Sequence, residues 1–138
     1  MLLLTYQNQN NMIDPEYLRQ EILKINEKHP NINYGGCGTF SYHLHKLLKE
    51  KYNVETEICY IPGPRCAIEY DVKFTHILVK WNNILIDNNG FYLRDDYSYQ
   101  LNDLSTDKLH EMINIPELWN NKFNHHYKEE LINDIYLI

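Results

Sequence analysis

The first amphipathic stretch of the chain is typical of a helix. Its apolar residues recur at intervals of three or four, which places them on one helical face: Leu18, Ile22 and Ile25. An Asp-Pro-Glu sequence at 14–16 supplies an N-cap acid, a proline suited to the first helical position and an acid in the first turn. We predict that the helix ends at the His-Pro pair at 29–30, because the residue before a proline avoids helical backbone angles.

The second amphipathic stretch predicts a helix over residues 37–52. Its apolar stripe is formed by Phe40, Leu44, Leu47 and Leu48. Cys37 is the first residue of this stretch and lies at the edge of the stripe, directly after two glycines. We therefore expect a thiol at the N-terminus of a helix, pointing toward whatever the helix packs on.

Several β-rich segments follow the second helix. Residues 54–61 alternate between apolar and polar, and we expect the Pro-Gly-Pro sequence at 62–64 to break this strand and residues 65–73 to form a loop. Residues 74–81 and 84–87 are two further predicted strands. The two asparagines between them tolerate the positive φ of a two-residue hairpin turn, and an Asn-Asn-Gly sequence ends the second strand.

The C-terminal part of the chain is predicted to be helical. A helix begins at Ser105 and continues through Leu109 and Met112, and residues 116–133 form one or two short helices. This order of elements indicates an α+β fold, with helices on one side of a mainly antiparallel sheet. Since 138 residues are the size of one domain, we expect residues 1–138 to form a single domain.

The charge of the chain narrows the classes of partner. Nineteen acidic and thirteen basic residues give a net charge of −6, and an acidic chain without a basic run is poorly suited to bind nucleic acid. No apolar run approaches the roughly 20 residues that span a bilayer, and no signal peptide is recognisable. We therefore expect a cytoplasmic protein without nucleic-acid or membrane partners. The bias toward Asn, Tyr, Ile and Lys suits an AT-rich genome such as a virus's, and the compartment is then the host cytoplasm.

The three cysteines do not suggest a disulfide framework or a metal site. Their number is odd, and Cys59 and Cys66 are seven residues apart, wider than the spacing of a structural zinc pair. His43 and His45 are two apart on the predicted helix, so they do not face one another. We expect Cys59 and Cys66 to be structural or incidental thiols and the protein to need no metal and no cofactor.

Cys37, His76 and Asp87 form the candidate chemical site. If Asn82-Asn83 make a two-residue turn, strand alternation places His76 and Asp87 on the same face as diagonal neighbours within hydrogen-bonding reach. A carboxylate in this position fixes the tautomer of an imidazole and supports its positive charge. A helix N-terminus and an imidazolium both favour the thiolate, the nucleophilic form of cysteine. Asn88 and Asn89 are the alternatives to Asp87 as the third residue.

The segments around these residues resemble those of the papain-like and transglutaminase-like cysteine peptidase superfamily. Residues 36–41, Gly-Cys-Gly-Thr-Phe-Ser, are similar to the nucleophile segment of papain-like peptidases. Residues 75–79 and 84–87 resemble the strands that carry the His and the Asn or Asp, and the order along the chain agrees. The resemblance covers about residues 31–90. It implies a minimal papain-like core, in which the nucleophile helix packs on an antiparallel sheet.

The resemblance also implies an activity, that of a thiol peptidase or amidase acting on a protein or peptide through a thioester. Papain-like peptidases usually place a Gln six residues before the Cys to complete the oxyanion hole. This sequence has Asn31 at that position and Asn33 closer to Cys37, so either is a candidate donor beside the Cys37 backbone N–H. Gly36 allows a substrate to approach the backbone closely.

Two alternative functions use the same residues. The first is an acyl transferase of the transglutaminase-like kind, in which an amine replaces water. The second is a non-catalytic papain-like protein that binds a protein or a small molecule.

Overall fold

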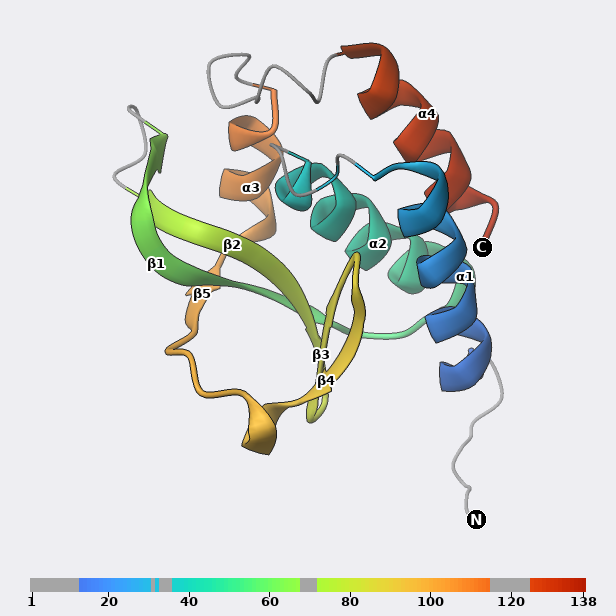
Figure 1. The fold of residues 1–138 in the computed structure, drawn as a ribbon, viewed down its shortest axis with the longest axis horizontal. Coiled ribbons are helices and arrows are strands. Elements are labelled where there is room, and N and C mark those ends of the chain that lie inside the picture. The colour runs from blue at the N-terminus through green and yellow to red at the C-terminus, as the bar shows by residue number, and fades with distance from the viewer. Residues whose placement is uncertain (1–12, 31, 33–35, 68–71, 115–124) are drawn as a thin grey trace.

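The computed structural model describes residues 13–30, 32, 36–67, 72–114 and 125–138. In chain order they form α1 (Pro15–Lys28), α2 (Cys37–Tyr52), β1 (Glu57–Ala67), β2 (Val72–Trp81), β3 (Ile84–Asp87), β4 (Gly90–Leu93), the 3₁₀ helix η1 (Arg94–Asp96), β5 (Asn102–Leu104), α3 (Thr106–Met112) and α4 (His125–Tyr136). The helices gather on one side of an antiparallel sheet, and α2 packs on β1, β2 and β3 (Figure 1). The predicted α+β class is confirmed.

Both N-terminal helices have the predicted bounds. The Asp14 carboxylate caps α1 by accepting a hydrogen bond from the Tyr17 backbone N–H at 3.3 Å, and the helix ends before His29. α2 begins at Cys37 and ends at Tyr52, and its C-cap residue Asn53 has a left-handed φ of 55°. Asn tolerates this conformation better than most residues, so it closes the helix at little cost.

The sheet has five strands in the order β4-β3-β2-β1-β5, and every neighbouring pair is antiparallel. The predicted turn between β2 and β3 is confirmed: Trp81 pairs with Ile84, and Asn82 has a φ of 53°. Two short strands, β4 and β5, were not predicted, because a strand of three or four residues carries too few alternations to stand out.

The Pro-Gly-Pro sequence at 62–64 does not break the first strand, so that prediction was wrong. β1 starts later than expected, at Glu57, and runs on to Ala67, with register shifts against β2 directly before and directly after Pro62. A proline is compatible with a strand at a bulge, where its missing N–H is not needed. The predicted loop at 65–73 is likewise wrong at its ends, where β1 and β2 continue, while residues 68–71 lie outside the described residues.

The helices at the C-terminal side agree with the predicted pattern where they are described. Ser105 caps α3 and accepts a hydrogen bond from the Lys108 backbone N–H at 3.1 Å, as expected for a helix start. α4 covers the second half of the stretch predicted to be helical at 116–133. Residues 115–124 lie outside the described residues.

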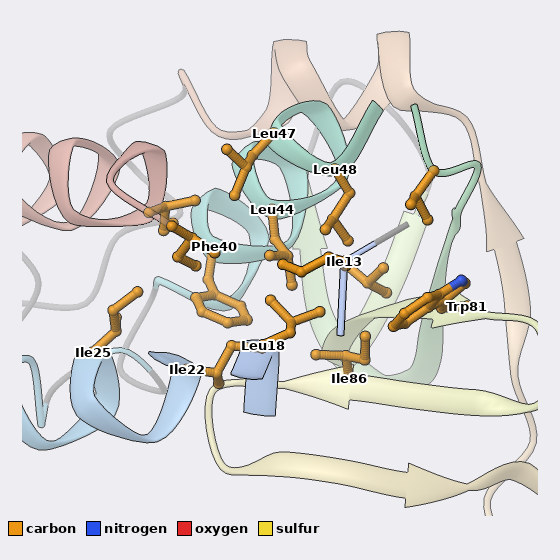
Figure 2. Packing of buried hydrophobic residues seen from close by; sticks show 14 of the residues in the cluster. Ile13, Leu18, Ile22, Ile25, Phe40, Leu44, Leu47, Leu48, Trp81 and Ile86 are labelled. Carbon is orange, nitrogen blue, oxygen red and sulfur yellow. The ribbon is translucent and has the colours of Figure 1, made fainter. Parts of the chain in front are cut away.

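A large apolar cluster joins the helices to the sheet. The predicted stripe of α2 lies at its centre and packs on the buried face of α1 and on the sheet residues Trp81 and Ile86 (Figure 2). A second cluster lies between the N-terminal end of α2, the sheet and α3: Cys37, Ile58, Phe74, Ile77, Leu104, Leu109, Met112 and Ile113. This second cluster holds the thiol in place.

Candidate active site

His76 and Asp87 come from neighbouring strands and are hydrogen bonded. His76 Nε2 lies 2.9 Å from Asp87 Oδ2. Asp87 is the last residue of β3. The hairpin register pairs Val79 with Ile86, and one step further it places Asp87 opposite Leu78 and diagonal to His76. Both side chains are shielded from water, with 18% of His76 and 7% of Asp87 exposed. The predicted contact between these two side chains is confirmed.

The backbone of β2 is irregular at the position of His76. Ile61 pairs with His76, but the next residue of β1, Pro62, pairs with Phe74, so that Thr75 is passed over. Phe74 and Ile77 are three apart and still pack in the same cluster, which strict alternation would not allow. Such a bulge re-aims the side chains around it. The bulge lies directly before His76, the strand residue that contacts Asp87 and lies near the thiol of α2.

Cys37 stands at the first position of α2, buried and only 5% exposed. Its thiol lies close enough to His76 to help raise the pKa of that imidazole. The helix is fixed to the strand one turn further on, because the Ser41 hydroxyl donates to the Ile77 carbonyl at 3.2 Å. Gly38 lets the side chain of Ile113, at the end of α3, pack closely on α2, since a Cβ at Gly38 would lie 3.1 Å from Ile113 Cγ2. The structure therefore brings together all three predicted residues.

The pKa of His76 reflects these contacts. Burial by itself lowers the pKa of an imidazole, but the hydrogen bonds to Asp87 and Cys37 and the negative charges of both partners outweigh burial and raise the pKa of His76 to about 9. The imidazole is therefore mostly protonated at neutral pH. A cationic imidazole beside a thiol at a helix N-terminus is the setting in which thiolates are stabilised.

Asp87 is held by more than His76. Its second oxygen, Oδ1, accepts a hydrogen bond from the Asn89 backbone N–H at 2.8 Å, and this turn fixes the carboxylate. Tyr92 of β4 lies close enough that burial, the charge of Asp87 and a hydrogen bond to it raise the pKa of the Tyr92 hydroxyl. Sequence reasoning missed Tyr92 because β4 was not predicted. Neither Asn88 nor Asn89 takes the place of Asp87 beside His76.

Among the described residues, no side chain caps the N-terminus of α2. Gly36 is the N-cap residue, it is buried, and it has no side chain that could accept a hydrogen bond from the first turn of the helix. A helix start left in this way presents backbone N–H groups and a partial positive charge to an anion. The predicted donors Asn31 and Asn33 lie outside the described residues, so their assignment stays a prediction.

The other candidate groups are engaged elsewhere. Burial raises the pKa of the Cys59 thiol to about 11, and its Sγ lies 3.9 Å from the Leu78 carbonyl oxygen, as expected of a structural thiol. His43 and His45 have separate partners, the Tyr136 hydroxyl at 3.0 Å and the Thr56 hydroxyl at 2.6 Å. Within the described ranges, no group of three or more His, Cys, Asp and Glu side chains is arranged to hold a metal ion.

Comparison with family models, with curated proteins and with solved structures found no match to this chain. None of the described helices is both long enough and apolar enough to cross a membrane.

Proposed function

We propose that the protein is a cysteine hydrolase of the papain-like superfamily, a peptidase or amidase that cleaves a carboxamide bond in a protein or peptide. The observation that carries the proposal is the position of His76, which is hydrogen bonded to Asp87 and lies close enough to Cys37 for the thiol to help raise the pKa of the imidazole. A base between an acid and a nucleophile is the arrangement that thiol hydrolases require. We also propose that residues 1–138 form a single domain built on a minimal papain-like core.

The proposed reaction has two halves. The Cys37 thiolate attacks the carboxamide carbon, and the tetrahedral oxyanion is held by the Cys37 backbone N–H and by Asn31 or Asn33. When the C–N bond breaks, protonated His76 gives its proton to the leaving amine and a thioester remains. Neutral His76 then takes a proton from water, and the resulting hydroxide attacks the thioester carbon. The C–S bond breaks and releases the carboxylic acid. Cys37 leaves as a thiolate, which either stays paired with protonated His76 or takes the proton back from it. Asp87 keeps the imidazole oriented throughout.

We extend the proposal to a cytoplasmic setting. Cys37 and Cys59 are both free and buried, and free thiols are retained most readily where glutathione and thioredoxin keep them reduced. We accordingly assign the activity to the cytoplasm, which is the host cytoplasm if the protein is encoded by a virus. The proposed substrate is a protein or peptide of that compartment.

The proposal is tested by the pH dependence of alkylation. We expect iodoacetamide to modify Cys37, identified by peptide mass mapping, with a rate that stays high below about pH 7, where a free thiol is largely protonated. In His76→Ala, we expect the rate at neutral pH to fall about 10-fold or more, because the cationic partner of the thiolate is gone. Cys59 serves as an internal reference, since its raised pKa keeps it a thiol.

A matched variant shows whether the effect of His76→Ala comes from the loss of the imidazole or from a general loosening of the fold. His45→Ala removes another histidine that is hydrogen bonded from α2 but does not touch the site, and it should leave the rate at Cys37 unchanged. If Cys37 follows the pH profile of free cysteine and His76→Ala changes nothing, the hydrolase proposal is wrong. The non-catalytic binding protein is then the better interpretation.

Product mass distinguishes the hydrolase from the acyl transferase. With a peptide library and an added primary amine, a hydrolase gives products that have gained water, whereas a transferase gives products that have gained the amine. Cys37→Ala must abolish either product. Turnover that survives this substitution would rule out the thioester route.

A further inference from the structure

The turn that follows Asp87 is tied to α1 by side-chain amides. Asn88 Nδ2 donates to Asn26 Oδ1 at 2.8 Å, and Asn26 Nδ2 lies 3.5 Å from Asn89 Oδ1. The same turn holds the Asp87 carboxylate through the Asn89 backbone N–H. We call Asn26, Asn88 and Asn89 the amide network. It links a helix that carries none of the three site residues to the backbone that positions the acid.

The buried side chain of Asn88 lowers the stability of the fold, because one of its polar atoms is unpaired among the described residues. The residue is 2% exposed, and its Oδ1 has no hydrogen-bond partner among the described residues. An unpaired buried acceptor costs about 1–3 kcal/mol, which an apolar residue of the same shape would avoid. Buried polar groups without a hydrogen-bond partner are found mainly at functional sites, where a protein gives up stability for function. The amide of Asn88 is therefore better explained by what it does for its neighbour Asp87.

We propose that Asn88, held by Asn26 of α1, is a positioning residue that fixes the Asp87 carboxylate against His76. The inference rests on the proposed function and extends it, because it gives α1 a part in setting the geometry of the site. Without the Asn26–Asn88 hydrogen bond, the turn at 88–89 is free to move, and the carboxylate spends less time in contact with the imidazole. The proton on His76 is then held less tightly.

The test is an NMR titration of His76 in the whole chain. Asn26→Ala is the first variant, because Asn26 is only half-buried, lies in a helix where Ala is favoured and does not touch the three site residues. We expect the pKa of His76 to fall by about one unit, a tenfold loss of proton affinity. Asn88→Ala should lower it by a similar amount. The double variant should lower it no further than Asn26→Ala alone, since Asn26→Ala already breaks the hydrogen bond that the Asn88 amide makes to α1.

The control is Asn133→Ala, which changes an exposed asparagine of α4, a helix that carries none of the three site residues. It should leave the pKa of His76 unchanged. An unchanged His76 pKa in a folded Asn26→Ala variant, or additive effects in the double variant, would overturn the positioning role. The proposed function fails by a different result, namely ordinary alkylation of Cys37 in the unmodified protein, while the titration of His76 still reports on the amide network.

Discussion

Two histidines show how strongly local surroundings decide the chemistry of a residue. Burial lowers the pKa of His43 to about 4, helped by the positive charges of Lys46, Lys128 and His110. His76 is also buried, but its contacts with an acid and a thiol raise its pKa to about 9. At neutral pH the first is a neutral hydrogen-bonding group and the second a cation. Only the second can act as a proton donor to a leaving group.

The raised pKa of His76 predicts a loss of stability in alkaline solution. Because the folded state binds this proton more tightly, the stabilisation is complete below pH 6.5 and is lost as the pH rises to about 9. At about 1.4 kcal/mol per unit, it amounts to at most roughly 3 kcal/mol. Urea unfolding at several pH values should show this fall in the wild type and a smaller one in His76→Gln. Parallel profiles for the two proteins would contradict the prediction.

At the scale of elements, the irregular pairing of β1 with β2 is the feature that shapes the site. The bulge around Thr75 coincides with the Pro-Gly-Pro sequence on the opposite strand, and the Thr75 hydroxyl donates to the Pro62 carbonyl at 3.3 Å. Gly63 lies so close to Thr75 that an ideal Cβ would be 1.6 Å from its Oγ1 and 2.8 Å from its backbone nitrogen. The glycine is therefore required by the close approach of two backbones.

Gly63→Ala should destabilise the protein by about 1–3 kcal/mol, because the backbone of β2 must shift to admit the methyl group. The matched control is Gly38→Ala on α2, where the nearest atoms are side-chain ends at 3.1–3.5 Å that can move. There the better helix propensity of Ala offsets part of the crowding, so we expect a change within about 1 kcal/mol. Both values come from urea unfolding. Equal losses in the two variants would show that the close approach at Gly63 is not limiting.

At the scale of the whole molecule, α4 packs on α2 and is also joined to α1 by polar side chains. Asp134 of α4 accepts a hydrogen bond from His29 at 2.7 Å and an ion pair from Lys28 at 3.0 Å. Burial by itself raises the pKa of Asp134, but the hydrogen bonds and charges of His29 and Lys28 outweigh it and lower the pKa. His29 is 3% exposed, so it depends on this partner to satisfy its ring nitrogen.

Asp134→Ala should lower the free energy of unfolding by about 2 kcal/mol, because it leaves the buried His29 nitrogen without its partner. Asp96→Ala, which removes an exposed acid of η1, is the control and should change stability little. The stabilisation by Asp134 is present above its ordinary pKa of 3.8 and is lost on acidification, so the difference between the wild type and the variant should shrink at low pH. A difference that does not depend on pH would exclude the ionised pair as its source.

The sequence by itself determined the elements that depend on local physical chemistry. The apolar spacing fixed α1, α2 and α3, and the capping side chains set the starts of α1 and α3. Asn82-Asn83 fixed the turn and hence the register that puts Asp87 beside His76. Only the tertiary structure decided how the prolines at 62–64 are absorbed as a bulge, which short strands complete the sheet, and that Tyr92 and Asn26 lie near Asp87. Helical spacing and turn chemistry act between residues close in the chain, whereas bulges, edge strands and buried amide pairs depend on what the rest of the chain places opposite them.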